Sequence, residues 1–545
     1  MKKNILLIAS LCAGLYACKD TATKHSEKEG SSTKSARNLS INKSNAYNDF
    51  FLDSNQVEQF IAQQKLSDTV SSRMIRFYND RNFEFAWFNS DGLNEQALAF
   101  RNLYEYDDTT NNRKALDRRL DGLMINDSIT ISANNASIVK NELSLTWRFI
   151  NYVCNKYRNE DARETAMLEL IPAKKMDLFE MADEELSSRK KEKIIKNDWY
   201  SGLRKELKIY TEQAKKGGWS TLPVPSKKLK EGKRDTLIAL IKNRIRLTQD
   251  YPKKDTSALI TAELKNAVRK IQEENGLAQD GIISPSLVKL LNISATERVK
   301  QLLVNLNRMC WMPETKNGRV ILVNIPEYKL HVVEGKDSVL NMAVVVGKQG
   351  HNTMMFSGSL NQVVFSPYWN VPPAIVENEI QPSIEKNENY LAEHNMEITG
   401  EEDGLPVVRQ LPGEKNELGK VKFLFPNSFN IYFHDTPHKD LFKEQKRAFS
   451  HGCIRLSEPV ALAKYLLKDQ NEWTDDKIDS AMNSGKEKFV RVKDPVPVLI
   501  YYYTAWVDGE GNLQWREDTY GRDKKMMRRL FSSGPSSPSQ EVASK

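Results

Sequence analysis

The stretch Ile431–Leu456, IYFHDTPHKDLFKEQKRAFSHGCIRL, organises the whole chain. It predicts a short strand that ends at His434, then a polar loop, then a tight turn that carries Cys453. Gly452 directly precedes the thiol, so the backbone can turn sharply there and leave its amide groups uncovered. His434 lies upstream of the thiol by 453 − 434 = 19 positions, a gap that allows two neighbouring strands joined by a loop.

A thiol near a histidine is the arrangement that nucleophilic catalysis requires. A base removes the sulfur proton, and backbone N–H groups stabilise the oxyanion of the attacked carbonyl. A single cysteine is more often a small buried hydrophobe, and a single histidine is more often structural. The run S-H-G-C at 450–453, with His434 ending a strand, favours catalysis. Zinc binding that also uses His438 is the alternative, but the spacing fits no common zinc motif, so no metal is predicted.

These residues resemble the signature of the L,D-transpeptidases of bacterial cell walls, which carry a YkuD-type catalytic domain. That signature is a histidine, a gap, and then Ser/Thr-His-Gly-Cys. Here His434 is followed by residues 435–449 and then by Ser-His-Gly-Cys at 450–453. The family often has asparagine two residues after the cysteine. This chain has Arg455 there, as is usual in the large multidomain branch of the family.

The resemblance implies an enzyme that cross-links peptidoglycan and needs no cofactor. Cys453 attacks the carbonyl of the third residue of a stem tetrapeptide, D-alanine leaves, and an amine of a neighbouring stem resolves the thioester into a 3→3 cross-link. His434 is the base and later the proton donor, oriented by the backbone carbonyl of Asp435. Backbone N–H groups of His451, Gly452 and Cys453 form the oxyanion hole. The family thiol also opens carbapenems, so acylation by these β-lactams is expected.

Four further residues are candidates for contacting the stem peptide. Arg455 presents a planar guanidinium fork that suits a carboxylate, and a structural ion pair explains it equally well. Trp369 and Tyr432 are candidates for lining the cleft, with core packing as the alternative. Ser450 begins the catalytic turn and is the fourth candidate.

Two other functions remain open. A cysteine hydrolase of peptidoglycan, acting as an L,D-carboxypeptidase, would use the same thioester with water as the acceptor. Many such hydrolases place the cysteine before the histidine, which is not the order found here. A wall-binding protein without activity would be expected to have a damaged site, whereas Cys453, His434 and Gly452 are all present.

Composition narrows the class of protein. A chain of 545 residues has room for about two to four domains. Lys and Arg total 80 against 72 Asp and Glu, a mild formal net charge of +8 without any arginine-rich block, so nucleic acid is not an expected partner. The five cysteines show no regular spacing of a disulfide framework, and a Cys154–Cys310 pair remains open.

Residues 1–18 predict a signal peptide, because two lysines precede an apolar run that is too short to span a membrane in the mature protein. The run Leu-Tyr-Ala-Cys ending at Cys18 resembles a lipobox. It implies an exported lipoprotein of the cell envelope or periplasm, held to the membrane by lipid on Cys18; simple signal-peptide cleavage is the alternative. Residues 19–45 are polar and predict a disordered tether.

The next part of the chain predicts helices, and the fold class is α+β multidomain. Residues 46–230 are expected to form a helical scaffold, whose run from Arg76 to Trp87 resembles the start of the scaffold domain in the large L,D-transpeptidases. Residues 234–293 predict three helices with Asn-Gly and Asp-Gly turns and resemble a small peptidoglycan-binding module, with a generic helical bundle as the alternative. Residues 294–318 predict a connecting helix.

From residue 319 the pattern changes to β-strands and turns. Residues 319–505 are expected to form the catalytic domain, with a lid insertion at about 375–408 that is flexible over 387–407. Residues 506–531 predict a terminal hairpin and tail, and residues 532–545 are rich in Ser and Pro and predict disorder. The implied partners are peptidoglycan stem peptides, glycan, and other proteins of cell-wall synthesis.

Overall fold

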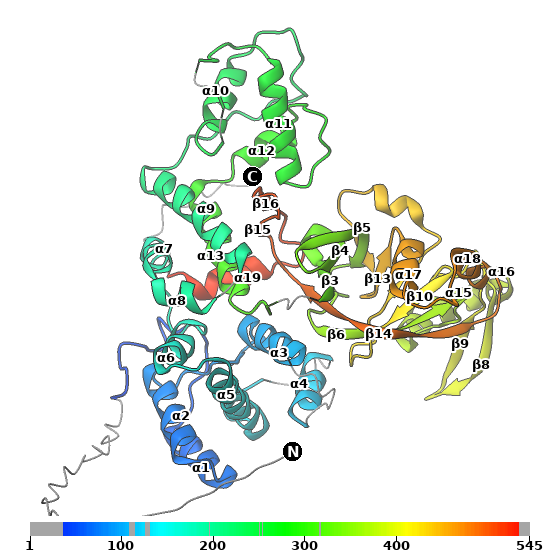
Figure 1. The fold of residues 1–545 in the computed structure, drawn as a ribbon, viewed down its shortest axis with the longest axis horizontal. Coiled ribbons are helices and arrows are strands. Elements are labelled where there is room, and N and C mark those ends of the chain that lie inside the picture. The colour runs from blue at the N-terminus through cyan, green and yellow to red at the C-terminus, as the bar shows by residue number, and fades with distance from the viewer. Residues whose placement is uncertain are drawn as a thin grey trace, which may run out of the picture.

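The computed structural model describes residues 36–107, 115–125, 131–195, 197–249, 251–252, 254–314 and 318–532. The predicted signal peptide, Cys18 and positions 533–545 lie outside the described residues. Figure 1 shows a helical scaffold, a small helical module, a β-rich domain and a lid at the far edge of that domain. The α+β multidomain organisation predicted from the sequence is confirmed. Within the described ranges, no helix is long and apolar enough to cross a bilayer.

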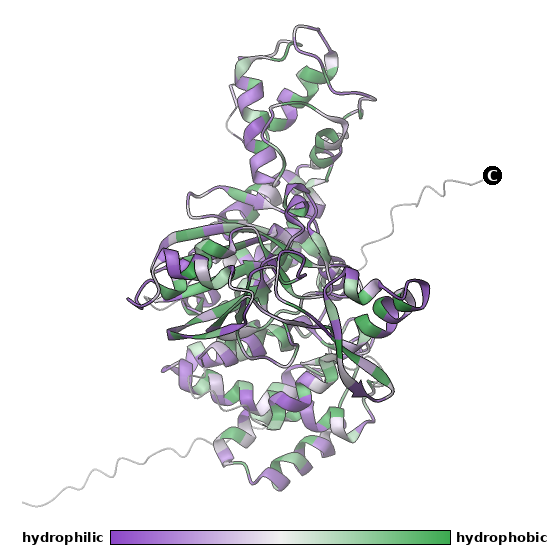
Figure 2. Ribbon diagram, turned by 90° about the vertical axis from the view of Figure 1, so that its right-hand side faces the viewer, coloured by the Kyte–Doolittle hydropathy of each residue, from purple (hydrophilic) through white to green (hydrophobic). Residues whose placement is uncertain are grey.

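The scaffold helices pack around one apolar core that contains Trp87, Phe100 and Phe149. Figure 2 shows hydrophobic residues along one side of these helices and hydrophilic residues along the other, as expected of helices that share a core. The helices are α1 (Ser54–Gln64), α2 (Asp68–Asp80), α3 (Glu95–Asp107), α4 (Ala115–Ile125), α5 (Ala136–Lys156), α6 (Glu160–Glu169), α7 (Leu178–Ser187), α8 (Arg189–Ile194) and α9 (Asp198–Lys215), with a short hairpin of β1 (Phe88–Asn89) and β2 (Gly92–Leu93).

The predicted tether of residues 19–45 is wrong at its end, because residues from about 37 onward pack on the scaffold. Ile41 is only 2% exposed. The Asn38 N–H donates to the Asn79 carbonyl at 2.9 Å, and the Asn82 side chain donates to the Ile41 carbonyl at 2.5 Å. One buried apolar residue and the bonding of neighbouring asparagines therefore order a segment that is polar in composition.

The small module consists of α10 (Thr236–Ile245), α11 (Ala262–Glu274) and α12 (Pro285–Leu291) around a core of its own. The Gln272 side chain closes the turn after α11, because its amide donates to Asp280 Oδ1 at 2.6 Å and its oxygen accepts from the Gly281 N–H at 2.8 Å. The three predicted helices are therefore present. Glycan binding by this module stays a prediction.

The β-rich domain is a nine-stranded sheet with the order β12-β5-β13-β11-β10-β6-β14-β3-β4. Because β5 also pairs with β4, the sheet closes on itself around an apolar core covered at one end by α17 (Pro459–Leu467) and α18 (Asp475–Met482). The strands are β3 (Arg319–Asn324), β4 (Lys329–Glu334), β5 (Asp337–Gly347), β6 (Ser357–Phe365), β10 (Val421–Leu424), β11 (Phe433–His434), β12 (Ala448–Ser450), β13 (Ile454–Leu456) and β14 (Lys488–Tyr501).

The lid is a folded unit with regular secondary structure, and flexibility of residues 387–407 stays a prediction. Its strands pair in the order β7-β9-β8 and enclose a separate core that includes Val376, Ile380 and Val408. Backbone pairing along the hairpin and this small core stabilise the unit. The elements are β7 (Trp369–Asn370), α14 (Pro373–Ile375), a π-helix (Val376–Ile380), α15 (Gln381–Lys386), α16 (Tyr390–Glu393), β8 (Met396–Glu402) and β9 (Leu405–Gln410).

The end of the chain returns to the scaffold. The hairpin of β15 (Ala505–Val507) and β16 (Leu513–Trp515) and the helix α19 (Arg522–Leu530) bury apolar side chains in the scaffold core. The connecting helix α13 (Ala295–Met309) lies in the same core, and Figure 1 shows it beside α19. Val320 and Leu322 of β3 and Leu499 of β14 belong to this core as well, so one face of the sheet packs directly on the scaffold.

Candidate active site

Two short parallel strands bring the predicted catalytic residues together. Strand β11 pairs with β13 so that Phe433 lies opposite Ile454 and His434 lies opposite Arg455. Side chains alternate along a strand, so His434 and Arg455 point to one face of the sheet. Cys453 lies two positions before Arg455 and therefore faces the same side. The fold thus converts a separation of nineteen residues into neighbours on one surface.

His434 is held as a neutral imidazole. Its side chain is buried at 4% exposure, and Nδ1 lies 2.5 Å from the backbone carbonyl oxygen of Asp435. Because a carbonyl can only accept, Nδ1 carries the proton and Nε2 is left with a free lone pair. Burial, and after it the nearby charge of the Arg455 guanidinium, lower the pKa of His434 from 6.5 to about 3. The imidazole is therefore uncharged at neutral pH.

The thiol of Cys453 is protonated in this resting arrangement. Burial raises its pKa to about 11, against the lowering effect of hydrogen bonds with Tyr432 and the charge of Arg455. Sγ donates to the Asn430 carbonyl oxygen at 3.6 Å, and across the described chain it makes no hydrogen bond to His434.

The turn before the thiol is closed by Ser450. Its hydroxyl donates to the Cys453 carbonyl at 2.5 Å and accepts from the Gly452 N–H at 3.1 Å. Gly452 has a φ of 115°, a conformation that favours glycine. Two predictions change as a result. Ser450 is 3% exposed and shapes the turn instead of contacting substrate, and the Gly452 N–H is already engaged and cannot serve an oxyanion.

The other two N–H groups predicted to bind an oxyanion, those of His451 and Cys453, have no hydrogen-bond partner among the residues that the structure describes. The His451 side chain is partly exposed, and its Nε2 lies 3.0 Å from Glu379 of the lid π-helix and 3.3 Å from Lys348. Partial burial and the charge of Lys348 lower the pKa of His451. The lid therefore contacts the catalytic turn directly.

The other predicted substrate contacts lie around this pair. Arg455 Nη2 is 3.6 Å from Glu417 Oε2, and its buried Nε has no partner within the described ranges. Tyr432 and His434 have ring centroids 5.7 Å apart. Burial and the adjacent Cys453 raise the pKa of Tyr432 well above its ordinary value, while a hydrogen bond with Trp369 opposes this. Tyr432 therefore lies beside the thiol and contacts Trp369, and Trp369 also packs on the lid core.

Comparison with known proteins assigns the β-rich part of the chain. Residues 318–525 match the family model of the YkuD L,D-transpeptidase catalytic domain, and residues 72–207 match the model of the scaffold domain. The chain carries an L,D-transpeptidase catalytic domain. The matched range includes the terminal hairpin and the first turn of α19, which the sequence alone assigned to a separate tail.

A Haemophilus influenzae protein named "Putative L,D-transpeptidase" is 32% identical over 294 residues, which cover 51% of this chain and 59% of that protein. The chain thus spans about three-fifths of the curated relative that it matches. A solved L,D-transpeptidase from Stackebrandtia nassauensis has a TM-score of 0.20 at 15% identity, and the aligned part covers 51% of this chain and 97% of the other chain. One from Xylanimonas cellulosilytica has a TM-score of 0.17 at 13% identity, covering 51% and 100%.

Several residues at the site of this L,D-transpeptidase domain carry no local sequence signal. Asn430, Lys348 and Glu379 lie on a loop, at the end of β5 and in the lid, and each reaches the catalytic turn only through tertiary structure. The pairing of β12 with β5 places Ser450 opposite Gly347 and so brings Lys348, the next residue, to the turn. In the described part of the chain, no group of three or more His, Cys, Asp or Glu residues could hold a metal ion.

Proposed function

We propose that this protein is an L,D-transpeptidase that forms 3→3 cross-links in peptidoglycan through a thioester on Cys453. The observation that supports it is the shared sheet face of Cys453 and His434, with Nδ1 of His434 bound to the Asp435 carbonyl and Nε2 left to accept a proton. The donor is a stem tetrapeptide that releases D-alanine, and the acceptor is an amine on a second stem.

Acylation transfers one proton and exchanges one bond. The sulfur of Cys453 bonds to the carbonyl carbon of the third stem residue while its proton moves to Nε2 of His434. The tetrahedral oxyanion forms against the Cys453 N–H. The carbon–nitrogen bond to D-alanine then breaks, and the imidazolium returns the proton to the leaving amine. Deacylation is the reverse sequence with the acceptor amine in place of D-alanine.

The electrostatics of the site suit the second half of that sequence. Burial and Arg455 lower the pKa of His434 to about 3, so a protonated His434 is a strong acid that readily protonates the leaving amine. Burial raises the pKa of the Cys453 thiol to about 11, so no stable thiolate waits in the empty site. Proton transfer therefore accompanies carbon–sulfur bond formation.

The test is intact mass spectrometry of the protein incubated with purified disaccharide-tetrapeptide, beside the Cys453→Ala variant. We expect a covalent adduct, released D-alanine and dimeric muropeptides from the wild type, and none from Cys453→Ala. An adduct that yields only tripeptide would favour the carboxypeptidase. Absence of both adduct and product from the wild-type protein would reject the proposal. A carbapenem should also acylate Cys453 and block the tetrapeptide adduct.

Export belongs to the same proposal, because the polymer lies outside the cytoplasm. Residues 1–18 would direct export and Cys18 would carry the lipid anchor. Metabolic labelling with a fatty-acid analogue should mark the wild-type protein and not Cys18→Ala. An unlabelled wild-type protein released from membranes would leave simple signal-peptide cleavage as the explanation.

A further inference from the structure

The peptide group between Gly452 and Cys453 accepts a hydrogen bond from a buried hydroxyl, that of Thr353. Thr353 has no exposed surface. Its Oγ1 donates to the Gly452 carbonyl at 2.8 Å and accepts from the Gly347 N–H at 2.9 Å, so the hydroxyl has one orientation. A trans peptide places its carbonyl and N–H on opposite sides. A Gly452 carbonyl turned towards Thr353 therefore directs the Cys453 N–H away from it.

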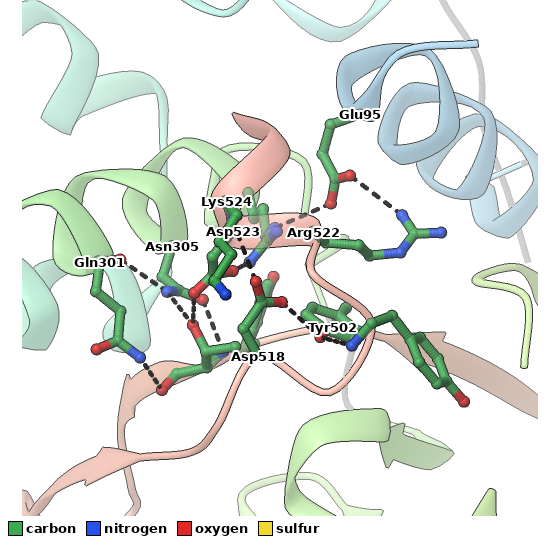
Figure 3. Close-up of polar contacts among 12 residues, drawn as sticks. Glu95, Gln301, Asn305, Tyr502, Asp518, Arg522, Asp523 and Lys524 are labelled. Atoms are coloured by element: carbon green, nitrogen blue, oxygen red, sulfur yellow. Dashed lines mark hydrogen bonds and ion pairs between the residues drawn. The ribbon is translucent and has the colours of Figure 1, made fainter. Parts of the chain in front are cut away.

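Tyr520, from the C-terminal segment, fixes Thr353 in turn. The Tyr520 hydroxyl accepts from the Thr353 N–H at 3.2 Å and donates to the Gly347 carbonyl at 2.7 Å. The Tyr520 N–H donates to the Tyr502 hydroxyl at 2.8 Å, and that hydroxyl donates to Asp518 at 2.8 Å. Figure 3 shows Tyr502 and Asp518 within a larger polar cluster. A continuous set of hydrogen bonds thus runs from Asp518, through Tyr502, Tyr520 and Thr353, to the Gly452 carbonyl.

We propose that Thr353 and Tyr520 are positioning residues, which act through the Gly452 carbonyl to aim the Cys453 N–H at the oxyanion. This inference rests on the proposed function for the identity of the acyl donor. The Cys453 N–H has no hydrogen-bond partner in the described part of the chain, so it is available to a substrate. Without the Thr353 hydroxyl the peptide plane can rotate, and the donor loses its direction while the thiol is unchanged.

Two reactions of the Cys453 thiol distinguish an effect on the direction of its N–H from an effect on the reactivity of its sulfur. Acetylation by p-nitrophenyl acetate passes through a tetrahedral oxyanion. The sulfur of Cys453 bonds to the carbonyl carbon, p-nitrophenolate leaves with the carbon–oxygen electron pair, and the thiol proton passes to His434. Alkylation by iodoacetamide displaces iodide from a saturated carbon and forms no oxyanion. Only the first reaction should depend on the Cys453 N–H.

The experiment measures both rates on the wild-type protein, Thr353→Val, Thr353→Ser and Tyr520→Phe, with Cys453→Ala giving the background from other thiols. Thr353→Val should lower the acetylation rate by about 10-fold to 100-fold, the cost of a misplaced group, and leave alkylation unchanged. Thr353→Ser should restore it, because it keeps the hydroxyl. Tyr520→Phe should lower the acetylation rate by less than Thr353→Val, because Tyr520 contacts Thr353 and not the Gly452 carbonyl.

An acetylation-to-alkylation ratio in folded Thr353→Val equal to that of the wild type would overturn the inference. If Thr353→Val does not fold, Tyr520→Phe decides the question, because it removes one oxygen atom, and an unchanged ratio there overturns the inference equally. Neither reagent is a peptidoglycan fragment. Failure of the wild-type protein to act on tetrapeptide would therefore reject the proposed function and leave this ratio intact.

Discussion

At the scale of single residues, the first prediction concerns His434 as the base. His434→Gln keeps a buried donor for the Asp435 carbonyl but removes the proton acceptor. Acylation by tetrapeptide or by a carbapenem should slow by about 10²-fold to 10⁴-fold, the usual size of a general-base contribution. Stopped-flow or time-resolved mass measurement of the adduct gives the rate. An acylation rate equal to that of the wild type would assign the base elsewhere.

The second prediction concerns the pH dependence of stability. Folded His434 takes a proton near pH 3 and an unfolded histidine takes one near pH 6.5. Between these values the unfolded chain binds more protons, so the stabilising contribution is complete above pH 6.5 and is lost as the pH falls. Each pH unit in this window costs about 1.4 kcal/mol, hence about 2 kcal/mol between pH 6.5 and pH 5.

His434→Gln has no proton to gain there, so its loss of stability between pH 6.5 and pH 5 should be smaller than that of the wild type by that amount. Calorimetric unfolding at several pH values, following the transition of the β-rich domain, measures the difference. Parallel stability curves for the two proteins would show that His434 titrates normally in the folded state.

At the scale of elements, the segment after β5 has to pass very close to its own backbone. A Cβ on Gly347 would lie 2.0 Å from the His351 carbonyl oxygen and 2.8 Å from the Thr353 nitrogen. Gly347→Ala must therefore move the segment that carries Thr353, and we expect both a lower thermal midpoint and slower acyl transfer. Mass measurement of the adduct and thermal unfolding test this together.

Gly122→Ala is the matched control for that substitution. Gly122 lies within α4, and a Cβ there would meet nothing within 4 Å. Removing a helical glycine should stabilise the protein by about 0.5–1 kcal/mol and leave acyl transfer unchanged. If Gly347→Ala behaves like Gly122→Ala, the close approach seen after β5 is not required for the fold.

The sequence predicted this site where the chemistry is local and failed where it depends on tertiary structure. The spacing of His434 and Cys453 and the β-rich pattern around them identify the pair, because both residues lie at strand ends in one short stretch. Thr353 and Tyr520 belong to no motif, and nothing in a lone threonine or tyrosine marks it as a partner of a distant turn. Its place in the catalytic turn predicts that Ser450 contacts substrate, but sequence proximity does not reveal which way a hydroxyl points, and this one bonds the Cys453 carbonyl.

At the scale of the whole molecule, scaffold and catalytic domain are joined by a buried ionic network that Figure 3 shows in part. Arg308 on α13 contacts Glu95 on α3 at 2.9 Å and Asp523 on α19 at 2.6 Å. Although burial raises the pKa of Glu95, Arg308 and Arg522 lower it overall. One arginine thus compensates two carboxylates that come from opposite ends of the chain, and the Tyr502 ring lies against its guanidinium.

Arg308→Met should therefore be costly. It leaves the buried Asp523 without its arginine, while Glu95 keeps only Arg522 at 3.1 Å. A buried charge that loses its partner typically destabilises a protein by about 3–5 kcal/mol. Lys446→Met is the control, because Lys446 and Glu517 are 71% and 75% exposed and an exposed pair contributes about 1 kcal/mol or less. Thermal unfolding and limited proteolysis between the domains measure the two effects.

The stability lost in Arg308→Met can come from uncompensated charge or from lost packing, and the two causes can be distinguished. If the cost comes from uncompensated charge, neutralising the carboxylates by Glu95→Gln and Asp523→Asn in the Arg308→Met background should recover part of the stability. Lowering the pH should also narrow the gap between wild type and Arg308→Met, because protonation removes the same charges. A triple variant no more stable than Arg308→Met, with a gap that is constant with pH, would mean that the arginine joins the domains by shape and not by charge.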